Sequence, residues 1–203
     1  MSAIITSPPS RQAYYLTEKE AALTAGKFIR ETAAGKRDRD VPDDVVSTTP
    51  SRDGNIASTG QPHALALDEV KDPYGNDWNR YLVTSGEQVT VHPKFQAGVL
   101  VRRISVFSTT ANWNPGAKLT RAQFDLAPDP AKLPYHRLFL AAPYTSEPAQ
   151  MDFTQGGLRP DSQFAFTVKL PARKPGYHAL LVEIDYANSG QAGYQILDLE
   201  YVG

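Results

Sequence analysis

Residues 176–203 read GYHALLVEIDYANSGQAGYQILDLEYVG and carry the clearest structural pattern in the chain. The run over 179–185 is mostly apolar, as expected of a strand that is buried. Over 197–201 apolar residues alternate with acidic ones, so the two kinds point to opposite faces of a strand. Glycine and polar residues separate the two runs. The segment therefore predicts two strands joined by a short loop.

The same period of two residues recurs earlier in the chain. Over 164–170, phenylalanine, valine and leucine alternate with smaller or polar residues, and the stretch PARKPG at 171–176 then turns the chain. Further strands are predicted over 80–83, 88–91 and 99–107. Short strands between proline- and glycine-containing turns are typical of β-sandwiches. The sequence therefore predicts an all-β fold.

One segment has the pattern of a helix. Thr17 and Glu20 form a capping box, in which each side chain satisfies an otherwise unpaired backbone amide. Good helix formers follow, apart from Gly26, and Gly35 ends the pattern. We expect a helix over about 17–35, followed by a solvated loop in which the two signs of charge largely cancel.

Composition limits the class of protein. The chain has 203 residues, 41% hydrophobic residues and a formal net charge of −1. One domain over 1–203 that buries a sizeable core is the simplest organisation, and we expect a monomer. The charge argues against nucleic acid as a partner, and no apolar run is long enough for a membrane span. With no cysteine and no pattern of a signal peptide, we expect either a cytoplasmic protein or export by a non-classical route.

Four stretches, in order, resemble motifs of bacterial lytic polysaccharide monooxygenases, also called chitin-binding proteins. They are SPPSRQAY at 7–14, DGNIAS at 53–58, NWNPGAKLTRAQFDL at 112–126, and GYH at 176–178 with Tyr194, Gln195 and Asp198. The resemblance implies a fibronectin-III/immunoglobulin-like β-sandwich with a helical insertion after the first strand. It also implies a surface that binds chitin or a related polysaccharide, although a shared fold does not by itself transfer activity.

Members of that family hold one copper ion between an N-terminal histidine and a second histidine. The resemblance places the first histidine position on Ser2 and the second within 96–99, where no histidine occurs; His92 is the nearest. The aromatic residue that packs against copper corresponds to Gly193. A hydroxyl is a poor copper ligand compared with an imidazole. We therefore expect no copper cofactor, no catalytic residue and no monooxygenase activity.

The other chemically active side chains have simpler interpretations. We expect His178 to make a structural hydrogen bond, His63 and His136 to be exposed, and Trp78 and Trp113 to have buried structural roles. The four histidines show no metal-binding spacing. Strand alternation predicts that the acidic residues of the strands face solvent, namely Asp125, Glu183, Asp185, Asp198 and Glu200.

Three tyrosines are the best candidates for contact with a ligand. Tyr14, Tyr15 and Tyr74 lie in or beside the insertion that the family uses to shape its substrate-facing surface. The favoured function is a non-catalytic polysaccharide-binding protein that has lost its copper site. The alternative is an exported effector or insecticidal, toxin-like protein that binds a protein or glycan at a cell surface. An oxidase with a rebuilt metal site is a third possibility.

Overall fold

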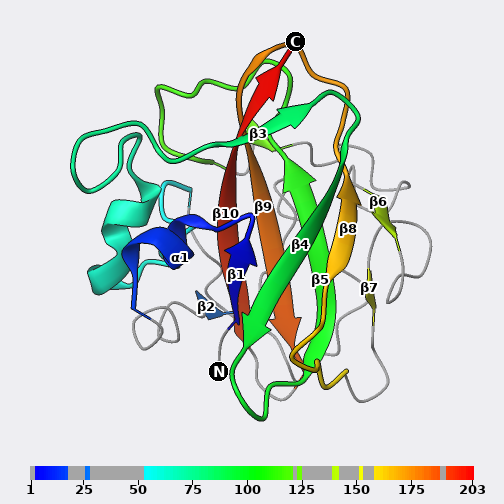
Figure 1. Ribbon diagram of the computed structural model, residues 1–203. Helices are drawn as coiled ribbons and strands as arrows, with labels where there is room; N and C mark the ends of the chain where they lie inside the picture. The colour runs from blue at the N-terminus through cyan, green and yellow to red at the C-terminus, as the bar shows by residue number, and fades with distance from the viewer. Residues whose placement is uncertain are drawn as a thin grey trace, which may run out of the picture.

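The computed structural model describes residues 3–17, 26–27, 53–120, 123–124, 139–141, 151–152, 158–187 and 191–203. Two β-sheets face each other in these residues (Figure 1). One sheet has the order β1-β4-β8-β6, and the other has the order β2-β10-β9-β5-β7, with β3 pairing in parallel with β10. The predicted fold class, an immunoglobulin-like β-sandwich, is confirmed.

The strands have the following bounds. The first sheet contains β1 (Ala3–Ser7), β4 (Gln88–Phe95), β8 (Phe166–Lys169) and β6 (Phe139–Ala141). The second contains β2 (Gly26–Lys27), β3 (Tyr81–Thr84), β5 (Val101–Ser108), β7 (Met151–Asp152), β9 (Gly176–Tyr186) and β10 (Gln191–Val202). Each strand predicted from the two-residue period is present, with ends shifted by a few residues.

The helical content differs from the prediction. A short helix, α1 (Arg11–Tyr15), begins at Ser10, whose hydroxyl accepts a hydrogen bond from the amide of Ala13. A 3-10 helix, η2 (Pro62–Asp68), follows later. The helix predicted over 17–35 is wrong at Gly26 and Lys27, which form β2 and pair with β10, while most of its other residues lie outside the described part of the chain.

Two hydrophobic cores lie on the two faces of the larger sheet. One core fills the space between the sheets and includes Ile104, Val182 and Leu197. The other lies on the outer face, where α1, η2 and the loop after β5 cover β9 and β10. Consequently β9 and β10 are buried on both faces, which is usual for the central strands of a covered sheet.

This double burial corrects the prediction for the acidic residues of the strands. Glu183, Asp185 and Asp198 are buried and do not face solvent. The outer face of the sheet is packed and not solvated, and Asp198 in particular is covered by α1, whose Arg11 pairs with it. Glu200 is partly exposed and pairs with Arg80. Asp125 lies outside the described residues.

Candidate functional site

The outer face of the larger sheet is anchored by an ion pair between α1 and β10. Arg11 donates from Nε to Asp198 Oδ2 at 2.9 Å and from Nη2 to Asp198 Oδ1 at 2.8 Å, and both side chains are almost fully buried. Arg11 Nη1 also donates to the carbonyl of Leu67, at 2.8 Å, which ties η2 to the same pair. A bidentate ion pair of this kind fixes the orientation of α1 as well as its position.

A series of aromatic contacts leads from this ion pair to the surface. The Arg11 guanidinium carbon lies 4.2 Å from the centre of the Trp78 ring. Tyr15 meets Trp78 edge to face, with ring centres 5.1 Å apart. Tyr14 and Tyr74 each lie 6.1 Å from Tyr15, centre to centre. We call Tyr14, Tyr15 and Tyr74 the tyrosine cluster.

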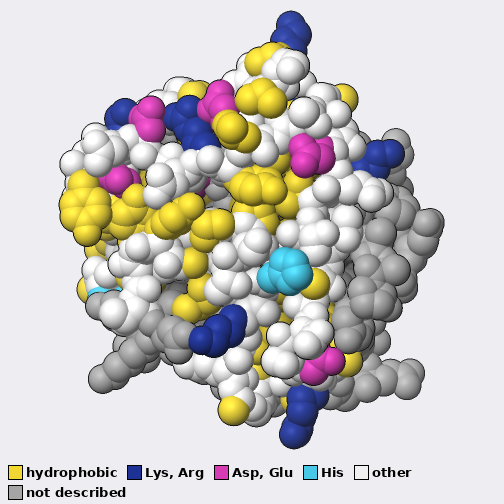
Figure 2. Space-filling view, in the orientation of Figure 1, with side chains coloured by type: hydrophobic (Ala, Val, Ile, Leu, Met, Phe, Trp, Pro, Cys, Tyr) yellow, Lys and Arg dark blue, Asp and Glu magenta, His cyan; other side chains and the backbone are white. Residues whose placement is uncertain are grey.

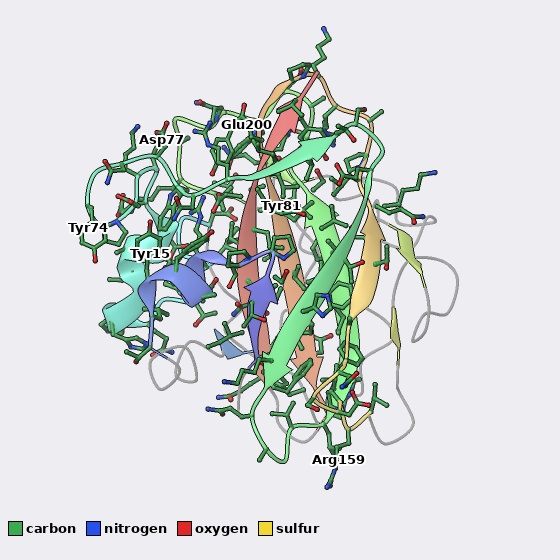
Figure 3. The ribbon with its side chains drawn as sticks, viewed as in Figure 1. Tyr15, Tyr74, Asp77, Tyr81, Arg159 and Glu200 are labelled. Atoms are coloured by element: carbon green, nitrogen blue, oxygen red, sulfur yellow. The ribbon has the colours of Figure 1, made fainter. Side chains whose placement is uncertain are left out.

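The two outer rings of the tyrosine cluster are exposed to solvent, and the inner ring is packed beneath them. Tyr14 is 47% exposed and Tyr74 is 80% exposed, while Tyr15 between them is partly buried. Tyr15 and Tyr74 lie together on the flank occupied by α1 (Figure 3). The space-filling view shows hydrophobic side chains gathered along the same flank (Figure 2). The outer rings are therefore accessible, and the inner ring is held by the core.

The loop that carries Tyr74 is fixed by Asp72. The Oδ1 atom of Asp72 accepts hydrogen bonds from the amides of Tyr74, at 2.9 Å, and Asn76, at 2.8 Å. Tyr15 donates its hydroxyl to Asp72 Oδ2 at 2.9 Å, so the same carboxylate joins the loop to α1. Gly75 has φ 85°, in the left-handed region that glycine adopts without strain.

The ionisation of this pair is set by its surroundings. Burial, together with the hydrogen bond to Asp72, raises the pKa of Tyr15 to about 12. Burial acts to raise the pKa of Asp72, but hydrogen bonds from Asn76, Tyr15 and Tyr74 outweigh it and hold this pKa below its usual value. At neutral pH the tyrosine is thus a hydroxyl donor and the aspartate an acceptor.

The structure brings together the three tyrosines that the sequence singled out. Their rings offer apolar faces with hydroxyls at the edge, which suits a ligand that has both an apolar face and hydroxyl groups. Sequence reasoning did not find Asp72, which orders the cluster. The stretch DPYGN at 72–76 carries the signal, because aspartate before proline and glycine favours a turn closed by the aspartate side chain.

The structure describes only some of the positions that the resemblance assigns to the copper ligands. Ser2 lies outside the described residues. Within 96–99, residues 96–98 are exposed and Val99 is buried in the core between the sheets. His92 is exposed on β4 and lies three residues before Phe95, the partner of Ala3 at the start of β1. At about 3.3 Å per residue, His92 is thus about 10 Å along the strand from that end.

The space beside Gly193 is filled by another aromatic residue. Tyr186, in the adjacent strand β9, is fully buried, and its hydroxyl accepts a hydrogen bond from the amide of Ala3 at 2.9 Å. A Cβ atom on Gly193 would lie 2.6 Å from this hydroxyl oxygen. Burial raises the pKa of Tyr186, so the hydroxyl stays protonated. The residues at this position therefore do not fit the arrangement of a copper site with an axial aromatic side chain.

The close approach of Tyr186 to Gly193 gives a double-mutant test. Gly193→Ala is expected to lower the free energy of unfolding by about 1–3 kcal/mol, because the added methyl overpacks a rigid site. In a Tyr186→Phe background the nearest ring carbon is at 3.5 Å, an ordinary contact, so the same change should cost less than about 1 kcal/mol. Urea denaturation of the four proteins measures the coupling. Equal costs in both backgrounds would contradict the packing described here.

Among the remaining histidines and tryptophans that the structure describes, His63, His178 and Trp78 agree with the sequence predictions, whereas Trp113, which was predicted to be buried, is only partly buried. His178 is buried, and its Nδ1 lies 3.0 Å from the hydroxyl of Thr109. His63 is exposed, Trp78 is buried, and Trp113 is partly buried. His136 lies outside the described residues. Within the described ranges, no group of three or more histidine, cysteine, aspartate or glutamate side chains could hold a metal ion. No helix among them is long and apolar enough to cross a membrane.

Comparison with known proteins identifies relatives of this fold and sequence. A family model described as "Lytic polysaccharide mono-oxygenase, cellulose-degrading" matches residues 3–199. GlcNAc-binding protein A of Aliivibrio fischeri is 28% identical over 151 residues, which are 74% of this chain and 26% of that protein. The chain thus spans about a quarter of the length of the curated relatives it matches.

Solved structures resemble the chain over nearly its whole length. A chitin binding domain from Burkholderia pseudomallei has a TM-score of 0.72 and 27% identity, and the match covers 99% of each chain. An AA10 lytic polysaccharide monooxygenase from Streptomyces lividans has a TM-score of 0.71 and 20% identity, and the match covers 98% of this chain and 99% of that one. At this lower identity the likeness is one of fold.

Proposed function

The chain belongs to the lytic polysaccharide mono-oxygenase family, and we propose that it binds a chitin-like polysaccharide without acting as a copper oxygenase. The observation that carries the proposal is the tyrosine cluster, two exposed rings held by a third. Such rings stack on the apolar faces of sugar units. The names of two relatives, a GlcNAc-binding protein and a chitin binding domain, favour polymers of N-acetylglucosamine as the ligand.

The fixed spacing of the rings supports a polymer as the ligand. Tyr14 and Tyr74 flank Tyr15, and each centre lies 6.1 Å from the centre of Tyr15. A surface with two accessible rings can contact more than one unit of a chain, and each contact then raises the local concentration for the next. Because Asp72 and Trp78 fix the base of the cluster, little ordering is needed on binding, which favours affinity.

The absence of oxygenase chemistry is the second part of the proposal. Valine at position 99 has no donor atom for a metal, and it is buried. The hydroxyl of Tyr186 occupies the space next to Gly193 and is already bonded to the amide of Ala3. These side chains support a surface in which packing has replaced the copper-binding arrangement.

The test is depletion of the protein from solution by insoluble polymers. Purified protein is incubated with α-chitin, β-chitin, cellulose and peptidoglycan, and the unbound fraction is measured against concentration. We expect saturable binding to chitin and weaker binding to cellulose. Absence of binding to all four polymers would refute the proposal and would direct the search to protein or cell-surface partners.

Titration with copper tests the second part. Calorimetry with Cu²⁺, on protein whose N-terminal residue has been checked by mass spectrometry, is expected to show no stoichiometric high-affinity site. Uptake of one copper ion per chain, with release of oxidised oligosaccharides from chitin, would instead establish an oxygenase.

A further inference from the structure

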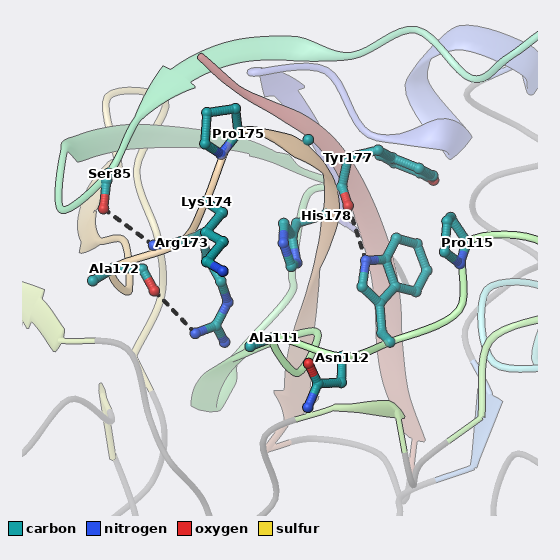
Figure 4. Close-up of a pocket in the computed structure, with 12 residues that line it drawn as sticks. Ser85, Ala111, Asn112, Pro115, Ala172, Arg173, Lys174, Pro175, Tyr177 and His178 are labelled. Atoms are coloured by element: carbon teal, nitrogen blue, oxygen red, sulfur yellow. Dashed lines mark hydrogen bonds between the residues drawn. The ribbon is translucent and has the colours of Figure 1, made fainter. Parts of the chain in front are cut away.

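A hollow lies away from the tyrosine cluster, where β9 begins. It has a volume of about 560 Å³ and is lined by the loop at 111–115, the turn at 172–175, the first residues of β9 and Ser85. Figure 4 shows Arg173 and Lys174 on one side of it, Tyr177 and Pro115 on the other, and His178 between them. Hollows of this size hold small ligands in many proteins. None of its lining residues belongs to the tyrosine cluster.

The lining is rich in positive charge. Arg173 and Lys174 contribute cationic groups, and within the described part of the chain the lining includes no aspartate or glutamate. This local excess stands out because the formal net charge of the whole chain is −1. A concave surface lined by one sign of charge attracts ions of the other sign.

The arginine is held in position by backbone atoms. Its Nη2 donates to the carbonyl of Thr109 at 2.8 Å and its Nη1 to the carbonyl of Ala172 at 3.2 Å. Its amide donates to the hydroxyl oxygen of Ser85 at 3.1 Å. Lys174, the next residue, is exposed and forms no ion pair with any residue that the structure describes. One cation is thus anchored and its neighbour is able to move onto a ligand.

An aromatic wall faces these cations. Trp113 lines the hollow and is partly buried, and its indole nitrogen donates to the carbonyl of Tyr177 at 2.9 Å. The rings of Trp113 and Tyr177 pack edge to face, with centres 5.0 Å apart, so the indole is fixed from two sides. Pro115 and Pro175 add apolar surface, while Ser85 and Asn112 add groups that form hydrogen bonds.

We propose that this hollow binds a sugar that carries a carboxylate. The cations recognise the carboxylate, the indole takes the apolar face of the ring, and Ser85 and Asn112 meet its hydroxyls. Charge-assisted hydrogen bonds to a carboxylate are stronger than neutral ones, so the acidic group supplies the selectivity. Two sources share this chemistry, the hexuronic acids and N-acetylmuramic acid.

Binding of soluble sugars tests the proposal with two matched pairs. Glucuronic acid is compared with glucose, and N-acetylmuramic acid with N-acetylglucosamine, by calorimetry or by NMR shifts of the Trp113 indole. The acidic member of at least one pair is expected to bind about tenfold more tightly than its neutral partner. If the acidic sugar is preferred in one pair and not in the other, that pair identifies whether the ligand is a hexuronic acid or N-acetylmuramic acid. Equal binding of acidic and neutral members in both pairs would overturn the proposal.

Matched lysine variants locate the site. Lys174→Gln is expected to weaken binding of the acidic sugar about threefold to fivefold. This loss should be smaller at high salt, because salt screens a charge contact that is partly exposed. Lys169→Gln, which removes another exposed charge from β8 outside the hollow, should leave binding unchanged. The same loss in both variants would indicate a general charge effect and would contradict the site. Because these sugars are soluble, the result does not depend on whether the protein is depleted by chitin.

Discussion

Replacing Asp198 by alanine is expected to lower the free energy of unfolding by about 3–5 kcal/mol, because it leaves the buried Arg11 guanidinium without its charge partner. Both side chains are almost fully buried, and Arg11 donates two hydrogen bonds to this carboxylate. Burial acts to lower the pKa of Arg11, but the charge of Asp198 and its hydrogen bonds outweigh burial and raise it, so the arginine stays charged. Urea denaturation followed by tryptophan fluorescence measures the loss.

A surface ion pair of similar length provides the control. Lys118 Nζ lies 2.6 Å from Glu69 Oε1, but these side chains are 47% and 51% exposed. Lys118→Gln should therefore cost less than about 1 kcal/mol. If Asp198→Ala cost no more than Lys118→Gln, burial would not be the source of the stability assigned to the pair between α1 and β10.

The strands were predictable because their pattern is local. Alternation over 164–170 and the apolar run over 179–185 each specify a strand without reference to the rest of the chain. The burial of Glu183 and Asp185 was not predictable in the same way. It depends on tertiary packing against the outer face of the larger sheet, which segments from distant parts of the sequence supply.

The insertion shows the limit of local propensity. The segment around Gly26 has many good helix formers, yet Gly26 and Lys27 pair with Ala192 and Gln191 at the start of β10. Strand pairing across so long a separation overrides a modest helix propensity, which glycine itself weakens. The short helix α1 begins within the stretch over 7–14 that resembles a family motif.

The motifs that revealed the family are mostly contacts of the scaffold. Ser10 donates to Gln195, and Arg11 pairs with Asp198, which joins the first motif to the last. In the second motif, the amides of Ala57 and Ser58 donate to Asp68. In the third, Trp113 donates to the carbonyl of Tyr177. Residues with these roles stabilise the fold even when residues at the surface are substituted. The resemblance therefore predicts the β-sandwich better than it predicts activity.

Tyr186 illustrates what sequence comparison alone left out. The resemblance to the family's motifs identified Gly193 as the position that lacks an aromatic side chain, but it did not show which residue fills the space beside Gly193. The answer depends on the register of β9 against β10, where Gly193 faces Ile184 and Tyr186 lies two residues further along the strand. The Tyr186 side chain extends toward Gly193, so that its hydroxyl lies next to Gly193 and accepts a hydrogen bond from the amide of Ala3.

A variant that lacks both outer rings of the tyrosine cluster is expected to lose most of its binding to chitin. Aromatic residues at the centre of a binding surface cost about 2 kcal/mol or more when truncated, or about thirtyfold in affinity for each ring. Tyr14→Ala combined with Tyr74→Ala should therefore reduce the protein bound at a fixed chitin load to near the background level. Stability should change little, since the two side chains are 47% and 80% exposed.

A matched tyrosine separates the cluster from a general effect of surface aromatic residues. Tyr81 on β3 is 45% exposed, nearly the same as Tyr14, and lies apart from Tyr15 and Tyr74 (Figure 3). Tyr81→Ala should leave the binding isotherm unchanged. Equal losses in the two variants would mean that adsorption is non-specific, and an unchanged isotherm for the double variant would place the polysaccharide elsewhere on the molecule. Loss confined to the double variant would assign the polymer to the flank formed by α1 and the loop over 72–76, because Tyr14 and Tyr74 lie on that flank beside Tyr15, whereas Tyr81 does not.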